Sequence, residues 1–309
     1  MILCLGTTPA LARTMIFDEV IADDVNRATS ILESASGKSI NAAKVARLLG
    51  EEVVATGFLG GDGGRFIRAQ LDQFGIKHKF VDVRQRTRTC ITVIDEQNGQ
   101  STELIEEPEP IDPAAWDQLR RTYKELVATA RIVILSGSLP PGGPIEFYAE
   151  CVSIAHGAKA RSIVDARGEV MAQAIFAKPY LIKPNEDELA ETTGVPIDSD
   201  GTLREAVREV LQAGATWCLV TRGGEPAIVA SEEGSCQITP PGVQVVSPIG
   251  SGDALAAGVA VGLLRNMSVP DAAKLGVACG SANAKNPLAG FIKVDDVYDL
   301  HPQVQLSAW

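Results

Sequence analysis

Short apolar runs alternate along this chain with stretches in which apolar residues recur every three or four positions. The first pattern predicts buried strands and the second predicts helices. Their alternation is typical of a mostly parallel sheet covered by helices, so we predict a single α/β domain over residues 1–309. The expected strands are 2–6, 52–58, 131–136, 161–165, 179–182 and 217–221. The expected helices are 39–49, 63–74, 112–129, 144–156, 186–192, 202–213, 251–265 and 270–285.

Two stretches depart from this alternation. Residues 14–34 contain short β-like pieces without a helix between them. Residues 87–106 contain the apolar runs Thr89–Ile94 and Thr102–Ile105, separated by a polar turn with Asn98 and Gly99. Asn-Gly between apolar runs strongly indicates a hairpin. We predict that both stretches form one small antiparallel sheet that projects from the domain; the alternative is edge strands of the main sheet.

Charge and composition narrow the possible partners. The formal net charge is −11, whereas nucleic-acid binding needs a basic surface that displaces phosphate counterions, so no nucleic acid is expected. A few basic residues in a cleft can still hold a small anion. No apolar run reaches membrane-spanning length, and the chain opens on the strand pattern Ile2–Gly6 without a basic leader, so we expect a cytoplasmic protein without membrane contact. The six cysteines lie mostly in apolar runs and are expected to be buried free thiols.

The segment 245–259 is the most informative for chemistry. A strand pattern ends in a turn with Gly250 and Gly252, and a helix of small residues follows. Glycine lets the backbone approach a ligand closely, and the first amides of a helix attract phosphate. Asp253 lies among these amides and has two interpretations, a helix cap or a chemical group. Because Ser251 can already cap this helix, we favour the chemical role.

This segment resembles the Gly-(Ala/Ser)-Gly-Asp motif of the ribokinase-like (PfkB-type) sugar kinases. The resemblance implies a three-layer αβα fold with a small antiparallel β lid, inserted from about 14–34 and 87–106. It also implies phosphoryl transfer from ATP with Mg²⁺. Asp253 would be the catalytic base, and Gly250, Ser251 and Gly252 would stabilise the transferring group.

A second motif runs from Leu181 to Leu189. Asn185 and Glu188 have capping-box spacing, which is the structural interpretation. The run also resembles the Lys-Pro-Asn-x-x-Glu motif of the same family. That likeness implies that Asn185 and Glu188 place Mg²⁺ largely through water and that Lys183 lies near the nucleotide.

Two further segments resemble the family's substrate-binding elements. Residues 136–142 follow an apolar strand, at the sheet edge where ligands bind in α/β folds, and imply Ser138 beside a sugar phosphate; a tight loop is the alternative. Residues 35–43 contain Gly-Lys-Ser, but Leu32 stands where a P-loop requires glycine. They resemble instead the family's Gly-Gly-Lys-Gly-x-Asn element. The contacts implied there are Gly37, Lys38 and Asn41.

The remaining assignments also rest on resemblance. Arg27 and Arg88 match lid positions that reach toward the sugar's own phosphate, and a guanidinium suits that task because it pairs bidentately with phosphate. An exposed surface arginine is the ordinary alternative for each. Thr221, Gly223 and Asn283 match nucleotide-contacting positions.

The branch with tagatose-6-phosphate kinase and 1-phosphofructokinase is the most similar, but Thr8 and Ala12 replace that branch's Asn and its sugar-binding Asp. We therefore expect an ATP-dependent kinase for a phosphorylated ketohexose, of the tagatose-6-phosphate, fructose-1-phosphate or fructose-6-phosphate type. The alternatives are a non-catalytic sugar-phosphate sensor and a kinase for another small alcohol, a sugar or a nucleoside. Lid strands often pair between subunits in this family, so a homodimer through the lid is a further expectation.

Overall fold

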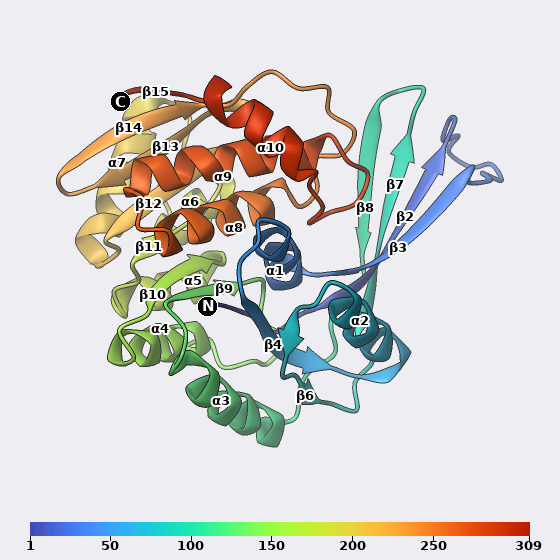
Figure 1. Ribbon diagram of the computed structural model, residues 1–309, viewed down its shortest axis with the longest axis horizontal. Coiled ribbons are helices and arrows are strands. Elements are labelled where there is room, and N and C mark those ends of the chain that lie inside the picture. Colours follow the sequence, from blue (N-terminus) through green and yellow to red (C-terminus); the bar gives the residue numbers. More distant parts are fainter.

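The computed structural model describes residues 1–309 and contains a large and a small sheet (Figure 1). The strands of the large sheet are β1 (Ile2–Gly6), β4 (Val53–Leu59), β5 (Lys77–His78), β6 (Val81–Asp82), β9 (Ile132–Ser136), β10 (Arg161–Asp165), β11 (Leu181–Ile182), β12 (Trp217–Arg222), β13 (Glu225–Ser231), β14 (Gly234–Thr239) and β15 (Gln305–Ala308). Their order is β15-β14-β13-β12-β11-β10-β9-β1-β4-β5, with β6 beside β4. The sheet is parallel from β5 to β12 and ends in three antiparallel strands.

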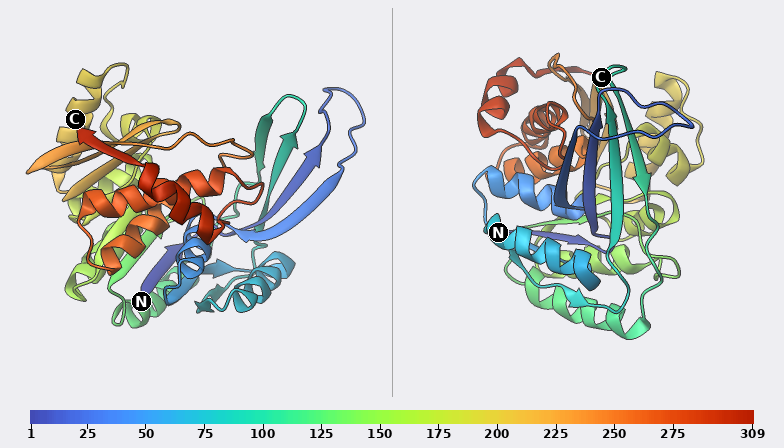
Figure 2. Two further views of the ribbon diagram at one scale, coloured as in Figure 1. Left: turned by 45° about the horizontal axis from the view of Figure 1, so that its top comes forward. Right: turned by 90° about the vertical axis from the view of Figure 1, so that its right-hand side faces the viewer.

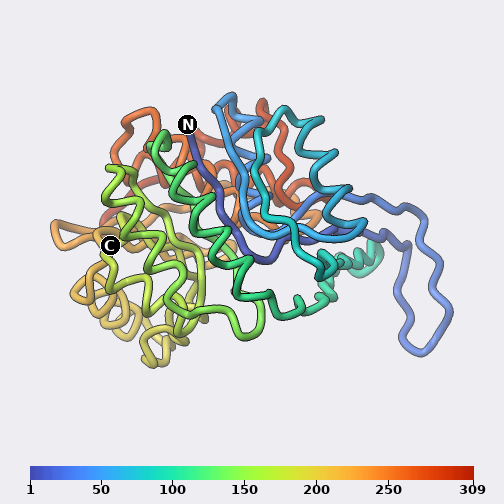
Figure 3. The backbone as a smooth tube through the Cα atoms, turned by 90° about the horizontal axis from the view of Figure 1, so that it is seen from below, coloured from blue at the N-terminus to red at the C-terminus, as the bar shows by residue number.

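Helices cover both faces of this sheet. They are α1 (Lys38–Leu48), α2 (Gly61–Gln73), α3 (Pro113–Val127), α4 (Phe147–Gly157), α5 (Gly168–Phe176), α6 (Glu186–Thr193), α7 (Asp200–Ala213), α8 (Ser251–Leu264), α9 (Val269–Ala284) and α10 (Val294–Leu300). Figure 3 shows α1, α2, α8 and α9 on one side of the sheet and the green and yellow helices α3–α7 on the other. Side chains of one strand alternate between two apolar cores: Ile2 and Cys4 join the first, and Leu3 and Leu5 join the second.

The small sheet consists of β2 (Ala10–Phe17), β3 (Ser30–Ser36), β7 (Arg88–Asp95) and β8 (Gln100–Ile105), in the order β3-β2-β7-β8. It projects from the domain as a lid (Figure 2). The prediction of a separate sheet is confirmed, and the alternative of edge strands in the main sheet is wrong. Both hairpins are antiparallel, and a parallel β2–β7 pair, which we did not anticipate, joins them.

Most of the predicted elements are present, with shifted ends. The predicted strand 179–182 is reduced to Leu181–Ile182. The antiparallel edge β13–β15, the short strands β5 and β6, and the helices α5 and α10 were not predicted.

Five of the six cysteines are buried, and Cys236 is partly exposed. No helix in the structure combines the length and apolar character needed to span a membrane.

Small residues allow α8 and α9 to pack backbone against backbone. A Cβ on Gly276 would lie 2.7 Å from the carbonyl oxygen of Leu255, and one on Gly258 would lie 2.7 Å from the Cα of Gly276. Neither helix can move away easily, because almost every residue of α8 is buried. This close packing fixes the position at which α8 begins.

Substituting Gly276 with Ala should therefore destabilise the protein, by about 1–3 kcal/mol, the usual cost of overpacking a core. The free energy of unfolding in urea measures the effect. Gly157→Ala is the matched control, because Gly157 also lies in a helix but a Cβ added there would meet nothing within 4 Å. Helix propensity predicts a gain of up to about 1 kcal/mol for that control. Equal stabilities of the two variants would contradict the packing argument.

Candidate active site

The candidate site lies where parallel strands of the main sheet end. β9 ends at Ser136, β10 ends at Asp165, and Lys183 follows β11. Because neighbouring parallel strands end at the same edge, these residues are brought together, as in other open α/β sheets. The helices α1 and α8 both contribute residues here, since Lys38 and Asn41 of α1 contact Asp165 and Asp253 respectively.

Asp253 is buried in the first turn of α8, with 7% of its surface exposed. The Nδ2 atom of Asn41 donates a hydrogen bond of 2.8 Å to Asp253 Oδ2. Burial raises the pKa of Asp253 to about 7, with a further contribution from the charge of Asp165, while Lys38 and Asn41 oppose the shift. A carboxylate with a pKa near neutrality is a stronger proton acceptor than an ordinary aspartate.

The turn before Asp253 presents backbone amides. Gly250 precedes the helix with a φ of 81°, which favours glycine. The prediction that Ser251 caps α8 is wrong: no side chain caps this helix, and the Ser251 hydroxyl lies 3.3 Å from Asn283 Nδ2. The Ser251 amide donates to Pro248 O, whereas the amides of Gly250, Gly252 and Asp253 have no acceptor in the chain. These three amides form a cradle suited to an anion.

A charge network lies beside the cradle; Asp165 and Lys183 are buried, and Lys38 is partly exposed. Lys38 Nζ is 2.8 Å from Asp165 Oδ1 and 3.2 Å from Glu188 Oε1. Lys183 Nζ is 3.2 Å from Asp165 Oδ2, and a Cβ on Gly252 would lie 3.4 Å from that same Nζ. The network therefore places ammonium groups against the first turn of α8.

The lysines determine the charge state of Asp165. Burial alone would raise the pKa of Asp165, but Lys183 and Lys38 outweigh it and hold the pKa below its usual value. Burial lowers the pKa of Lys38, and the carboxylates of Asp165, Glu188 and Asp253 outweigh that, so the net pKa is raised. We did not predict Asp165 as a site residue, although its position directly after a buried strand, at this edge of the sheet, was a usable signal.

Asn185 and Glu188 form the capping box that their spacing indicated. Asn185 Oδ1 accepts from the Glu188 amide at 2.7 Å, and Glu188 Oε2 accepts from the Asn185 amide at 3.0 Å. Thr221 pairs with Asn185 across a single β-bridge. Gly223 lies in the exposed turn after β12.

Asn283 has a supporting position. It is fully buried, and its Nδ2 donates to Ile249 O at 2.9 Å while its Oδ1 accepts from the Gly290 amide at 2.9 Å. Both ends of the side-chain amide are thus engaged within the chain. Asn283 thus links the turn before α8 to the loop that contains Gly290.

The expected phosphate-binding residues fall into separate places. Arg88 lies at the start of lid strand β7, where Nη2 donates to Thr8 O at 3.2 Å and Nη1 donates to Glu106 O at 3.3 Å. The hydroxyls of Thr7 and Thr8 donate to Ser138 O at 2.9 and 3.2 Å, which brings Ser138 to the same region. Arg27 is exposed and lies in the connection between β2 and β3. That connection forms the free end of the lid, away from α8 (Figures 1 and 2).

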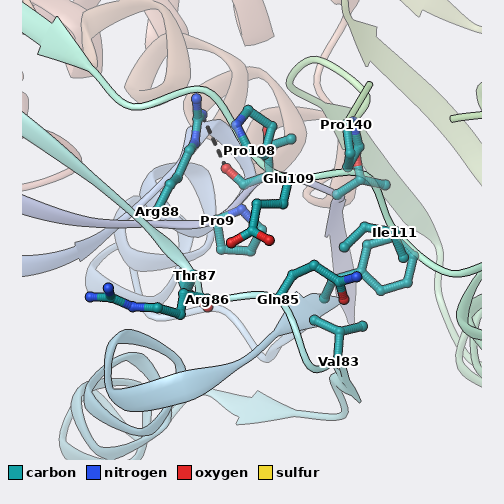
Figure 4. Close-up of a pocket in the computed structure, with 13 residues that line it drawn as sticks. Pro9, Val83, Gln85, Arg86, Thr87, Arg88, Pro108, Glu109, Ile111 and Pro140 are labelled. Atoms are coloured by element: carbon teal, nitrogen blue, oxygen red, sulfur yellow. Dashed lines mark hydrogen bonds between the residues drawn. The ribbon is translucent and has the colours of Figure 1, made fainter. Parts of the chain in front are cut away.

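A small, open hollow lies under the lid next to Arg88 (Figure 4). Figure 4 shows the side chains of Gln85 and Glu109 directed into it. Thr8 lines the hollow, but Asp253 does not. The cradle at α8 and the hollow under the lid therefore have no lining residue in common.

Comparison with known families matches residues 1–295 to the pfkB family carbohydrate kinases. The chain belongs to this family. A phosphofructokinase candidate from Staphylococcus aureus shares 31% identity with a TM-score of 0.81, over 100% of this chain and 99% of that one. Phosphofructokinase-2 from Escherichia coli, solved with substrates and products, shares 27% identity with a TM-score of 0.91, over 98% of both chains.

A 1-phosphofructokinase candidate from Thermotoga maritima has a TM-score of 0.92 at 23% identity, over 100% of this chain and 99% of that one, a likeness of fold. The predicted ribokinase-like, three-layer architecture is confirmed. The pfkB protein is a carbohydrate kinase, as the resemblance implied.

Asp165→Asn should destabilise this pfkB protein by about 3–5 kcal/mol, because it leaves the buried ammonium of Lys183 without its partner. Unfolding in urea at pH 6 measures the loss. Since the folded pKa of Asp165 is depressed, its contribution is present above the unfolded pKa of about 4 and is lost as the pH falls below it. The difference between wild type and variant should therefore shrink in acid.

Asp117→Asn is the control for that comparison, because Asp117 forms an exposed pair with Arg120. Exposed pairs contribute about 0–1 kcal/mol. A loss at Asp165 no larger than at Asp117 would show that the buried network does not stabilise the fold.

Proposed function

We propose that this protein transfers the γ-phosphoryl group of ATP to a hydroxyl of a phosphorylated ketohexose, with Asp253 as the general base. The observation that carries the proposal is the buried Asp253, with a pKa raised to about 7, beside three amides that have no acceptor in the chain. A base and an anion cradle within one helical turn match what phosphoryl transfer requires. Membership of the pfkB family supports the same reaction class.

Each part of the site has a defined task in this proposal. Asp253 accepts the proton of the attacking hydroxyl, and Asn41 orients its carboxylate. The amides of Gly250, Gly252 and Asp253 stabilise negative charge on the transferring group, with Lys183 beside them. ATP with Mg²⁺ supplies the phosphoryl group when bound. The free amides and ammonium groups suit its phosphates, and hydrated Mg²⁺ suits Asn185 and Glu188, reached through water.

The proposed nucleotide contacts lie at Lys183, Asn185, Thr221 and Gly223, with Asn283 acting through the turn that it holds. Gly37, Lys38 and Asn41 would contact the sugar. Its phosphate would lie near Ser138 and Arg88. Arg27 would reach a phosphate only if the lid moved or if a second copy of the chain presented its lid.

The sugar itself is less constrained. Ala12 lies in lid strand β2 and is buried, and its methyl group cannot accept a hydrogen bond from a hydroxyl. The Thr8 hydroxyl is already bonded to Ser138 O. Ala12 therefore offers a sugar hydroxyl no acceptor, whereas an aspartate at this position would offer two carboxylate oxygens. The loss of one such hydrogen bond changes the free-energy difference between competing sugars by about 1–3 kcal/mol. We propose a tagatose-6-phosphate, fructose-1-phosphate or fructose-6-phosphate type of acceptor.

An acceptor screen tests the proposal. ADP release from Mg-ATP is measured over ketohexoses and nucleosides, each with and without a terminal phosphate. We expect turnover with at least one ketohexose phosphate and at least tenfold lower kcat/KM with its unphosphorylated form.

Asp253→Asn should lower kcat about 10²–10⁴-fold, the usual contribution of a general base, while ATP still binds. Asp82→Asn, at an exposed carboxylate, should have no effect.

The pH dependence of kcat/KM is a second test of Asp253 as the general base. Because the deprotonated form of Asp253 is needed and its pKa is about 7, kcat/KM should fall about tenfold per pH unit below pH 7 and level off above it.

Near-normal turnover by Asp253→Asn would refute the role of Asp253 as the general base. Phosphosugar binding without ADP release would indicate a sensor, and turnover of an unphosphorylated alcohol would indicate the third alternative.

We also propose a homodimer that forms through the lid. Apolar side chains of the lid are exposed at Ile31, Leu104 and Ile105, with exposed fractions of 56%, 53% and 51%. Burying such side chains is favourable, and a second lid presents the same set by symmetry. Light scattering should give twice the chain mass of 32.6 kDa, and Leu104→Lys should shift it toward the monomer. A wild-type mass of one chain would refute this assembly.

A further inference from the structure

Lys44, on the buried side of α1, is a lysine that the proposed chemistry does not use. It is 2% exposed, and its Nζ donates to Ala35 O at 2.7 Å and to Ala289 O at 2.9 Å. Lys44 takes part in none of the ion pairs of the structure. A buried ammonium is costly unless its donors are satisfied, so these two carbonyls are what stabilises it.

The first carbonyl belongs to the base of the lid. Ala35 lies near the end of β3, two residues before Gly37. Its N–H donates to Gln70 Oε1 at 2.7 Å, so side chains hold both sides of this residue's backbone. The lid strand is thereby fixed to α1 and α2 at the point where it enters the domain.

The second carbonyl belongs to the loop after α9, which packs against the candidate site. A Cβ on Gly290 would lie 2.6 Å from the Cα of Asn41, and a Cβ on Gly250 would lie 2.8 Å from the Cβ of Ala289. Asn41 is the donor to Asp253, and Gly250 begins the amide cradle. Residues 289–290 thus fill the space between the two elements that position Asp253.

We propose that Lys44 is a positioning residue for phosphoryl transfer. Its Nζ joins the base of the lid to the 286–291 loop, and that loop supports Asn41 and the Gly250 turn around Asp253. The link to catalysis rests on the proposed function. The link to the geometry of the α8 turn does not, so the two can be tested separately.

The tie does not depend on the charge of Lys44. Burial lowers the pKa of Lys44 to about 7, and the charge of Asp253 opposes this shift. An ammonium has three N–H donors and a neutral amine has two, so either form can satisfy both carbonyls. The same connection is therefore present on both sides of neutrality.

The test compares Lys44→Met, which keeps the length and loses the donors, with Lys44→Arg, which keeps donors. Arg47→Met is the matched control, because Arg47 lies on the same helix and also donates to a backbone carbonyl, Phe74 O, away from the site. Residue-resolved hydrogen exchange is read at Ser251, Ala254 and Gly290, whose amides are hydrogen bonded. We expect at least tenfold faster exchange at these amides in Lys44→Met alone.

Kinetics on the acceptor found by screening give the second readout. Lys44→Met should lower kcat at least tenfold with less than a threefold change in the KM for ATP, and Lys44→Arg should recover part of the loss. Unchanged exchange in folded Lys44→Met would overturn the positioning role. If that variant does not fold, Lys44→Leu, which also lacks donors, replaces it in the same comparison. If no acceptor is phosphorylated, the proposed function fails while the exchange result still decides the role of Lys44.

Discussion

The burial of the Asp253 carboxylate at the start of α8 is the interaction on which the rest of the site depends. Removing a carboxylate from water is unfavourable, and the raised pKa of Asp253 reflects that cost directly. The Asn41 amide and the nearby Lys38 offset part of it, and the positive end of the helix dipole at the start of α8 also favours the ionised carboxylate. The backbone contact of α8 with α9 matters for the same reason, because it determines where that helix end lies.

The lysines beside Asp253 affect the pKa values of two carboxyl groups, Asp253 and Asp165. Asp165 raises the pKa of Asp253, while Lys38 and Lys183 lower it. The same two lysines keep Asp165 ionised. The charge network thus sets the ionisation of both carboxyl groups. Under the proposed function, an incoming phosphate would compete with Asp165 for the ammonium groups of Lys38 and Lys183.

Much of the fold could be predicted from sequence because apolar periodicity records which face of an element is buried. The parallel strands and the lid hairpin of residues 89–105 were recognisable in this way, and the family motifs led to Asp253, Asn41 and Lys38. The strands β13–β15 were missed because the run from 225 to 239 carries no strong alternation, and β15 comes from the far end of the chain. The parallel β2–β7 pair joins segments some 80 residues apart, which local patterns do not report.

Buried polar groups were the least predictable part of the site. Asp165 and Lys44 lie in ordinary strand and helix patterns, and only tertiary contacts identify their partners: two lysines for the first and two backbone carbonyls for the second. Ser251 shows the converse, because its sequence position favoured a helix cap while Asn283, more than thirty residues later, lies within bonding distance of its hydroxyl. Sequence spacing describes local geometry well, but it does not say which distant donor competes for the same oxygen.

Under the proposed function, substrate choice and lid position would be coupled through the backbone of the lid. Ala12, where a sugar-binding carboxylate is missing, lies within β2, paired with Ser34 of β3 and Cys90 of β7. Arg88 begins β7, and Ala35 near the end of β3 is the residue that Lys44 holds. A displacement of this sheet therefore moves Ala12, Arg88 and the entry to α1 as one unit. Because Asn41 of that same helix donates to Asp253, the position of the lid and the orientation of the Asp253 carboxylate are linked through α1. Under the proposed function, sugar selection and proton transfer would depend on this one link.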